Sequence, residues 1–122
     1  MCSSDLLSRY GFDNIVVVAA TTSSDQLADF SNFGTNSVAI AAPGDSIYST
    51  YCYSDSSYET MSGTSMAAPH VTGALALMMA QFPNASYQDL IAKLLSSADK
   101  IPALDGHVSS GGRLNLAKAL AP

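Results

Sequence analysis

The sequence predicts an α/β protein with a mostly parallel central sheet. The run 14–20, Asn-Ile-Val-Val-Val-Ala-Ala, is continuously apolar, which is typical of a strand covered on both faces. A long apolar segment at 64–81 and a second helical pattern after Ser86 supply helices to cover such a sheet. The length of 122 residues suits a single domain, and 48% hydrophobic residues are enough for a buried core.

A second strand and a hairpin are expected before the long helix. The short apolar run 38–41 ends at Pro43-Gly44, which is a turn signal, and the polar segment 21–36 between the two strands is typical of a loop. Residues 46–61 carry tyrosines on both sides of the polar turn 54–57, which predicts a β-hairpin.

The long helix is expected over about 64–81, because Phe82-Pro83 stops it. From Val71 to Ala80 it is apolar all round apart from Thr72, so we expect a central buried helix with close packing at Gly73. Residues 86–89 form a capping-box pattern for the next helix, and a last short helix follows Gly111-Gly112.

The net charge excludes some partners. A formal charge of −5 with five Lys and Arg argues against nucleic acid or an anionic membrane, since both need clustered positive charge. No apolar run reaches the roughly 20 residues that a membrane span needs. No signal peptide is visible at the N-terminus.

The run 62–71, Ser-Gly-Thr-Ser-Met-Ala-Ala-Pro-His-Val, places a serine where a polar turn meets the apolar helix. Pro69 is tolerated only near the first turn of that helix, so Ser65 must lie at its N-terminal rim. There the free backbone N–H groups and the helix dipole favour a negative charge, which is what an attacked carbonyl oxygen becomes. Ser65 is therefore a candidate nucleophile.

The same run closely resembles the active-site serine motif of the subtilisin-like serine proteases (subtilases). Weaker resemblance, through residues 30–34 and 41–44, extends from about residue 9 to the end of the chain. It implies a three-layer subtilisin-like α/β fold of which these residues are the carboxy-terminal part. It also implies a serine endopeptidase of proteins or peptides, with Ser65 as nucleophile and its backbone N–H in the oxyanion hole.

A serine nucleophile needs a histidine base and an orienting carboxylate. His70 is five residues along the helix, which turns it about 140° away from Ser65. His107 lies in a loop that lacks the family's His-Gly-Thr-His pattern. The family order of Asp, His, Ser and its oxyanion Asn loop place these groups upstream of this segment. We therefore expect the 122 residues alone to be inactive and to fold poorly.

The resemblance also implies residues near the substrate: Phe30, Met61, Ser62 and Thr64. Phe30, Met61 and Ser62 would approach the leaving-group side. The alternative interpretation is that they only pack the hairpin against the helix. The main specificity pocket would be lined mostly by upstream residues.

No metal or other cofactor is expected within this segment. Many family members bind calcium with a carboxylate at the position of Ala39, where this chain has no ligand. Calcium remains possible elsewhere in the intact enzyme. The resemblance further implies secretion and a partner in the upstream part of the same catalytic domain.

Residues 1–6, Met-Cys-Ser-Ser-Asp-Leu, resemble the translation of a sequencing adaptor, so residues 7–122 are taken as the family-related region. The alternative is a natural amino terminus. If the adaptor interpretation holds, Cys52 is the one native cysteine and predicts no disulfide framework.

Two other functions stay open. A catalytically inactive subtilisin-like module kept for binding or scaffolding would carry the same serine motif. An α/β-hydrolase is a remote alternative, since 63–67 imitates its Gly-x-Ser-x-Gly elbow, but residues 54–62 make a poor strand before it.

Overall fold

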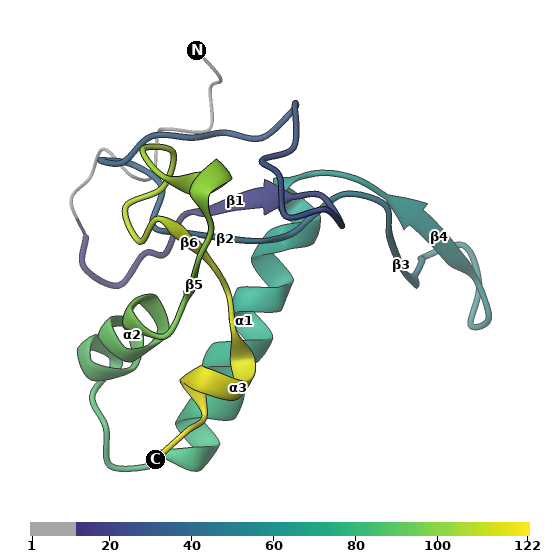
Figure 1. Ribbon diagram of the computed structural model, residues 1–122. Coiled ribbons are helices and arrows are strands. Elements are labelled where there is room, and N and C mark those ends of the chain that lie inside the picture. The colour runs from purple at the N-terminus through teal and green to yellow at the C-terminus, as the bar shows by residue number, and fades with distance from the viewer. Residues whose placement is uncertain (1–11) are drawn as a thin grey trace.

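A four-stranded sheet in the order β1-β2-β6-β5 lies at the centre of the computed structural model, which describes residues 12–122 (Figure 1). Strands β1 (Val18–Thr21) and β2 (Ile40–Pro43) are parallel, with Val18 opposite Ile40. Strand β6 (Gly112–Arg113) runs parallel to β2, and β5 (Asp99–Lys100) is an antiparallel edge. The sheet is therefore mostly parallel, as the sequence predicts.

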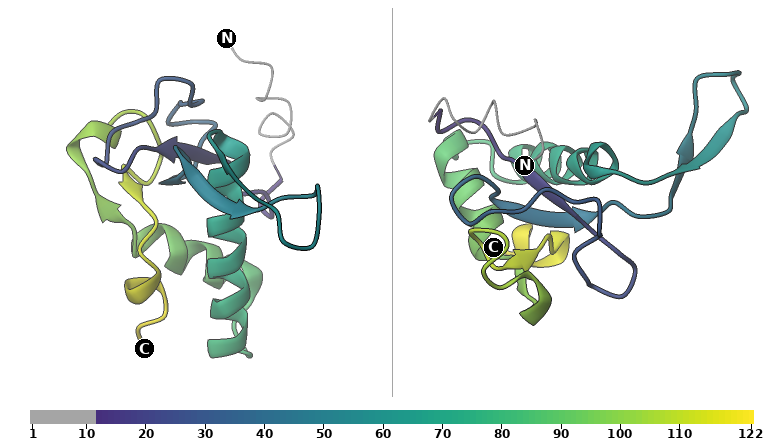
Figure 2. Two further views of the ribbon diagram at one scale, coloured as in Figure 1. Left: turned by 90° about the vertical axis from the view of Figure 1, so that its right-hand side faces the viewer. Right: turned by 90° about the horizontal axis from the view of Figure 1, so that it is seen from above.

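Both faces of the sheet are covered (Figure 2). Helices α1 (Thr64–Gln81), α2 (Tyr87–Ser96) and α3 (Leu116–Ala119) pack on one face around Ala20, Ile40 and Ala42. The other face, which carries Ala19 and Ala41, is covered by Leu104 and Val108 from the segment that contains the 3-10 helix η3 (Pro102–Leu104). Burial on both faces explains the continuous apolar strand patterns.

The two predicted strands exist, but each begins later than its apolar run. The segments before the two strands already pair, because the Ala39 N–H donates to the Val17 carbonyl at 2.9 Å. The regular ladder of β1 and β2 nevertheless starts at Val18 and Ile40. Strands β5 and β6 have only two residues each and were not expected. A continuous apolar run marks burial and does not mark where backbone pairing begins.

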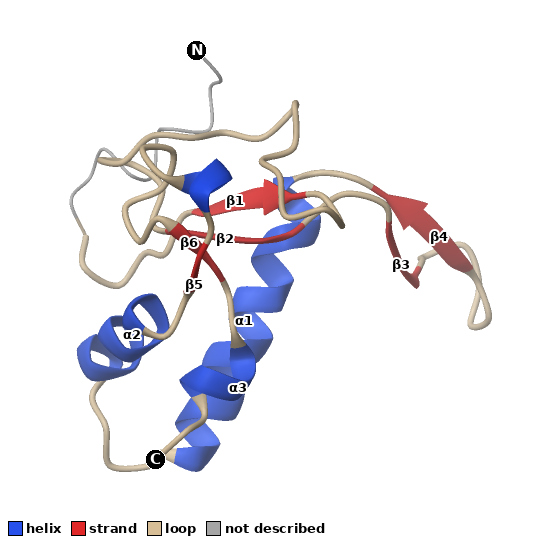
Figure 3. Cartoon of the chain, in the orientation of Figure 1, coloured by secondary structure: helices blue, strands red, loops and turns tan. Residues whose placement is uncertain are grey.

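The predicted hairpin is confirmed as β3 (Ile47–Thr50) and β4 (Tyr58–Met61), with Ile47 opposite Met61. It projects from the rest of the fold and leads directly into α1 (Figure 3). The capping box of α2 is also confirmed, since Ser86 Oγ accepts from the Asp89 N–H and the Ser86 N–H donates to Asp89.

The bounds of α1 agree with the prediction, but its burial does not. Its buried residues form one stripe, namely Ala67, Val71, Ala74 and Met78. Leu77 is 50% and Met79 62% exposed, and a Cβ at Gly73 would meet nothing within 4 Å. Among the described residues α1 is covered only on the side of the sheet and its neighbouring helices, so the expectations of all-round burial and of close packing at Gly73 are wrong for this structure.

Pro69 lies further into α1 than expected, as its sixth residue. Because proline has no N–H, the carbonyl of Ser65 lacks the hydrogen bond that residue i+4 normally gives. No described helix is both long and apolar enough to cross a membrane.

The turn after β2 meets the start of α1 at Gly44. The Gly63 N–H donates to the Gly44 carbonyl at 2.8 Å, and the Gly44 N–H donates to the Thr21 carbonyl at 3.0 Å. A Cβ on Gly44 would lie 2.6 Å from the Cβ of Ala20 and 2.8 Å from the Gly63 carbonyl oxygen. Only glycine allows this approach, which fixes the start of α1 against the carboxyl ends of β1 and β2.

The sheet edge is tied to α3 through Asp99. Its carboxylate accepts from Lys118 Nζ at 2.6 Å and from Asn115 Nδ2 at 2.9 Å, and it also pairs with Arg113 at 3.3 Å. The hydrogen bonds from Lys118 and Asn115 hold the pKa of Asp99 below its usual value.

Gly44→Ala is expected to lower the free energy of unfolding by about 1 to 3 kcal/mol, because the new methyl group forces the Ala20 strand and the Gly63 carbonyl apart. Urea denaturation of the full-length protein that carries this segment measures the change. Ser23→Ala, at an exposed loop position, is the control and should change stability by less than about 0.5 kcal/mol. Equal effects of the two substitutions would contradict the close-approach argument.

Asp99→Asn in the full-length protein that carries this segment is expected to lower the thermal midpoint at pH 7, because the charged partner of Lys118 is lost. A carboxylate with a lowered folded pKa stabilises the protein above its unfolded value, near 3.9, and this contribution disappears as pH falls through the folded pKa. The difference in thermal midpoint between wild type and Asp99→Asn should therefore shrink below about pH 4. Asp105→Asn makes the same charge change in an exposed loop, and its difference in thermal midpoint from wild type should not shrink at low pH.

Candidate active site around Ser65

Ser65 is the second residue of α1 and lies where the helix begins beside the carboxyl ends of β1 and β2 (Figure 1). Its side chain is exposed, and its hydroxyl makes no hydrogen bond within residues 12–122. The hydroxyl is thus accessible to a reacting group and to a base from outside these residues.

The backbone around Ser65 favours a negative charge. Gly63 caps the helix without a side chain, and its carbonyl accepts from the Met66 and Ala67 N–H groups at 3.0 and 3.3 Å. The N–H groups of Thr64 and Ser65 precede these bonds and have no carbonyl acceptor inside the helix. Together with the positive end of the helix dipole, they can donate to an oxyanion.

A serine and an aspartate hold the loop that leads into the helix. Ser62 Oγ donates to Asp45 Oδ1 at 2.8 Å and accepts from the Ser46 N–H at 2.8 Å. Ser46 has a φ of 57°, so this turn adopts a conformation that non-glycine residues rarely take. The brace joins the turn after β2 to the residue three positions before Ser65.

A cavity of about 450 Å³ opens between the hairpin and the first turns of α1. Met61 and Ser65 both line it, together with Met66 and Pro69 of the helix. Its other lining residues, apart from His70, come from the hairpin: Ile47, Tyr48, Ser49, Thr50, Tyr51 and Glu59. The nucleophile candidate therefore faces a space large enough for substrate side chains.

Neither described histidine is paired with Ser65. His70 lines the same cavity, but its Nδ1 lies 2.9 Å from the Met66 carbonyl, which can only accept, so Nδ1 carries the proton. His107 donates in the same way to the Asp105 carbonyl at 3.0 Å, and its ring packs edge-on against Phe33 at 5.5 Å. The sequence places His70 on the side of the helix away from Ser65, whereas the structure has both residues lining one cavity without a hydrogen bond between them.

Three of the upstream aspartates also have other partners. Asp13 accepts from the Tyr87 hydroxyl at 2.9 Å, and this bond raises the pKa of Tyr87. Asp25 pairs with Arg113, and Asp45 belongs to the brace with Ser62. No aspartate–histidine–serine chain exists within residues 12–122.

The other candidate substrate residues separate in space. Phe30 is 47% exposed and lines a different cavity, which also contains Asp29 and Asp45. Thr64 is half-buried as the first residue of α1. The contacts of Ser62 are those of a structural brace, while Met61 faces the Ser65 cavity. Sequence reasoning missed Asp45 and Glu59, because no motif marks a carboxylate that tertiary structure brings to the site.

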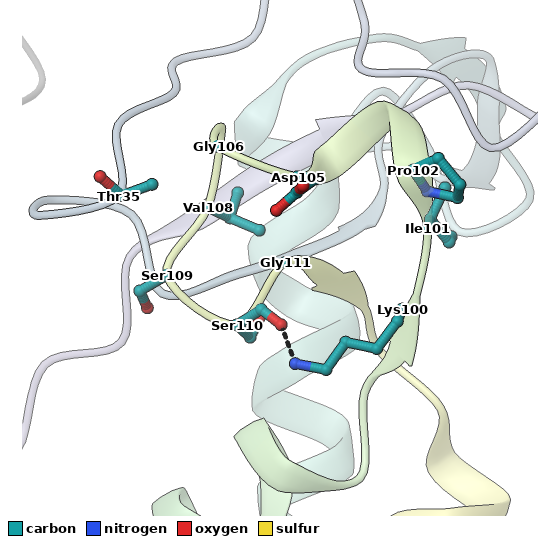
Figure 4. A pocket seen from close by; sticks show the side chains of 10 residues that line it. All are labelled: Thr35, Lys100, Ile101, Pro102, Asp105, Gly106, Val108, Ser109, Ser110 and Gly111. Atoms are coloured by element: carbon teal, nitrogen blue, oxygen red, sulfur yellow. Dashed lines mark hydrogen bonds between the residues drawn. The ribbon is translucent and has the colours of Figure 1, made fainter.

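A larger cavity, of about 660 Å³, lies in the loop that follows β5 and carries no comparable chemistry (Figure 4). Its cation, Lys100, donates to the carbonyl of Ser110, and its carboxylate, Asp105, comes from the adjoining turn. Ser65 and His70 do not line it. The sequence motif and this cavity are on different parts of the fold.

Ala39 lies near the calcium position that the family resemblance implies. Ala39 has no side-chain oxygen, and its carbonyl already accepts from the Ser110 N–H at 3.0 Å and the Ser109 hydroxyl at 3.2 Å. Residues 12–122 contain no group of three or more His, Cys, Asp or Glu side chains that could hold a metal.

Comparison with known proteins identifies the family. The model of the subtilase family (Peptidase S8) matches residues 3–113. The chain belongs to the subtilase family. This is a family of serine proteases, and the match extends over both the serine motif and the sheet around it.

Two curated relatives illustrate the similarity. Thermitase from Thermoactinomyces vulgaris is 41% identical over 109 residues, which are 89% of this chain and 37% of thermitase. An extracellular serine proteinase from Thermus sp. (strain Rt41A) is 46% identical over 80 residues, or 66% of this chain and 19% of that protein. The chain thus spans little more than a third of thermitase and less of the Thermus enzyme.

Solved structures confirm the subtilase fold. The A-subunit of the AB5 toxin from E. coli superimposes with a TM-score of 0.74 at 38% identity, covering 86% of this chain and 36% of that subunit. The α/β-hydrolase alternative is thereby excluded, since β4 before the serine belongs to the projecting hairpin and not to the central sheet. Residues 1–6, whose origin the sequence left open, lie outside the described residues.

Ser62→Ala is expected to lower the free energy of unfolding by about 0.5 to 1.5 kcal/mol, because the Asp45 carboxylate and the Ser46 N–H both lose their partner. Asp45→Ala should cost a similar amount, and the double variant less than the sum of the two. Asp45→Asn keeps an acceptor oxygen and should cost less. Additive effects in urea denaturation of the full-length protein would show that the brace does not couple the two turns.

Proposed function

We propose that Ser65 is the nucleophile of a serine endopeptidase that hydrolyses peptide bonds in proteins through an acyl-enzyme. The observation that carries this proposal is the exposed Ser65 hydroxyl, free of hydrogen bonds within residues 12–122, at the N-terminus of α1 in a member of the subtilase family.

In this mechanism Ser65 Oγ attacks the scissile carbonyl carbon and transfers its proton to a histidine, which passes it to the leaving amine. The carbonyl oxygen becomes an oxyanion and accepts from the Ser65 N–H at the end of the helix dipole. Water then attacks the acyl-enzyme and releases Ser65. Gly44 and the brace of Ser62 and Asp45 fix the position of the attacking oxygen.

The histidine, the aspartate and a second oxyanion donor come from an upstream part of the same catalytic domain. The limited share of its relatives that this chain spans supports this proposal. So does the apolar surface of α1, where Leu77 and Met79 are 50% and 62% exposed and need a covering layer. Gly73 then lies beneath this covering layer, where the absence of a side chain allows the layer to approach α1 closely.

The substrate is a protein or peptide. The acidic composition argues against a nucleic acid or an anionic membrane as partner, since both attract clustered positive charge. The Thermus relative is named an extracellular serine proteinase, which supports the proposal that this enzyme is secreted. Any calcium in the intact enzyme would bind outside the Ala39 position, where the side-chain ligand is missing.

Ser65→Ala in the full-length protein that carries this segment is expected to abolish covalent labelling by a fluorophosphonate probe, because the probe needs an activated serine oxygen. Mass spectrometry of the labelled wild-type protein should locate the adduct on Ser65. His107→Gln, far from the cavity, should leave labelling intact.

Labelling that survives Ser65→Ala would refute the assignment. A full-length protein that folds and shows neither labelling nor cleavage would instead identify the inactive binding module. The 122-residue chain alone should cleave no peptide, since it lacks a base for Ser65, and a cooperative unfolding transition together with cleavage by this segment would contradict that expectation.

A further inference from the structure

The cavity beside Ser65 contains a carboxylate. Among residues 12–122, Glu59 is the one Asp or Glu that lines it, two residues before Met61 on the same face of β4. Its side chain is exposed, and it makes no hydrogen bond or ion pair with another described residue. Such a group is free to pair with a ligand.

An aromatic ring lies on the same face of the hairpin as Glu59. Glu59 is paired with Ser49, and Tyr51, two residues after Ser49, lies on that face and lines the cavity. Tyr48 also contributes to the lining, but its ring stacks on Tyr58 on the opposite face of the hairpin. The pKa of Tyr51 is raised by its hydrogen bond to Tyr53, and the charge of Glu59 acts in the same direction.

No Lys or Arg among residues 12–122 pairs with Glu59, and His70, which lines the same cavity, is hydrogen-bonded to the Met66 carbonyl. The sequence has no Lys or Arg between residues 12 and 92. The four described basic residues have partners elsewhere: Lys93 over the Phe82 ring, Lys100 on the Ser110 carbonyl, Arg113 with Asp25 and Asp99, and Lys118 with Asp99. The cavity therefore presents an uncompensated negative charge beside the nucleophile.

We propose that Glu59 makes this enzyme prefer substrates with a lysine or arginine side chain on the leaving-group side of the scissile bond. The inference rests on the proposed peptidase function and adds a substrate class to it. The leaving-group side is the one on which the resemblance to subtilases places Met61, and Met61 shares a strand face and a cavity with Glu59.

The chemistry of the cavity suits a cation better than an anion or an apolar group. The Glu59 carboxylate can accept from an ammonium or guanidinium group, and the ring of Tyr51 can attract the same charge. Because the site is exposed, the expected preference is modest, about two- to fivefold in kcat/KM. It should weaken as salt screens the carboxylate.

The test uses the full-length protein and quenched fluorescent peptides that differ at one residue on the carboxyl side of the cleaved bond, Lys against Glu. Wild type should cleave the Lys peptide with the higher kcat/KM, and the ratio should fall in 0.5 M NaCl. Glu59→Gln should bring the ratio towards one, and Glu59→Lys should reverse it. The same exchange on the amino side of the bond should be insensitive to Glu59.

Asp55→Asn is the matched control, since it removes one negative charge at the hairpin turn outside the cavity. It should leave the Lys to Glu ratio unchanged. An unchanged ratio in Glu59→Gln, or an equal change in Asp55→Asn, would overturn the proposal, because the preference would then not come from Glu59.

A binding measurement separates this inference from the proposed function. Fluorescence anisotropy of the same peptides, labelled, on the Ser65→Ala protein should show tighter binding of the Lys peptide, lost on adding Glu59→Gln. Discrimination in binding without any cleavage by wild type would refute the peptidase function alone. Equal binding of the two peptides would refute the role of Glu59.

Discussion

The contact between Gly44 and the start of α1 is the constraint on which the site depends. The backbone of the turn after β2 approaches Gly63 and Ala20 so closely that no side chain fits between them. This contact joins the sheet, which is buried on both faces, to the end of α1 that carries the exposed Ser65. Backbone atoms of the core therefore set where Ser65 lies.

A second connection, the brace of Ser62 and Asp45, holds the other side of the same junction. The two contacts act on different groups. Gly44 fixes where the helix begins, and the brace fixes how the hairpin strand enters it. The missing N–H of Pro69 leaves the Ser65 carbonyl without its helical partner, so the first turn depends on these contacts more than an ordinary helix does.

The sequence predicts best where composition changes abruptly. The bounds of α1 follow from the step between polar 54–62 and the apolar residues after it, and from Pro83 at the other end. The first residues of β1 and β2 could not be predicted, because apolar side chains continue on both sides of the paired residues. Two-residue strands such as β5 carry no periodicity at all. The serine motif identifies Ser65, but the Glu59 cavity and the Asp45 brace arise from tertiary contacts between segments that have no motif.

The hairpin of β3 and β4 packs against itself far more than against the rest of the fold, and it is held mainly at its two ends. Elements with few core contacts open locally with a smaller free energy than the whole protein. The wall of the cavity beside Ser65 is thus the part of the site that can shift as a unit while the helix end stays fixed. In the proposed peptidase, a substrate that enters between them can be accommodated by bending the hairpin, and Ser65 need not move.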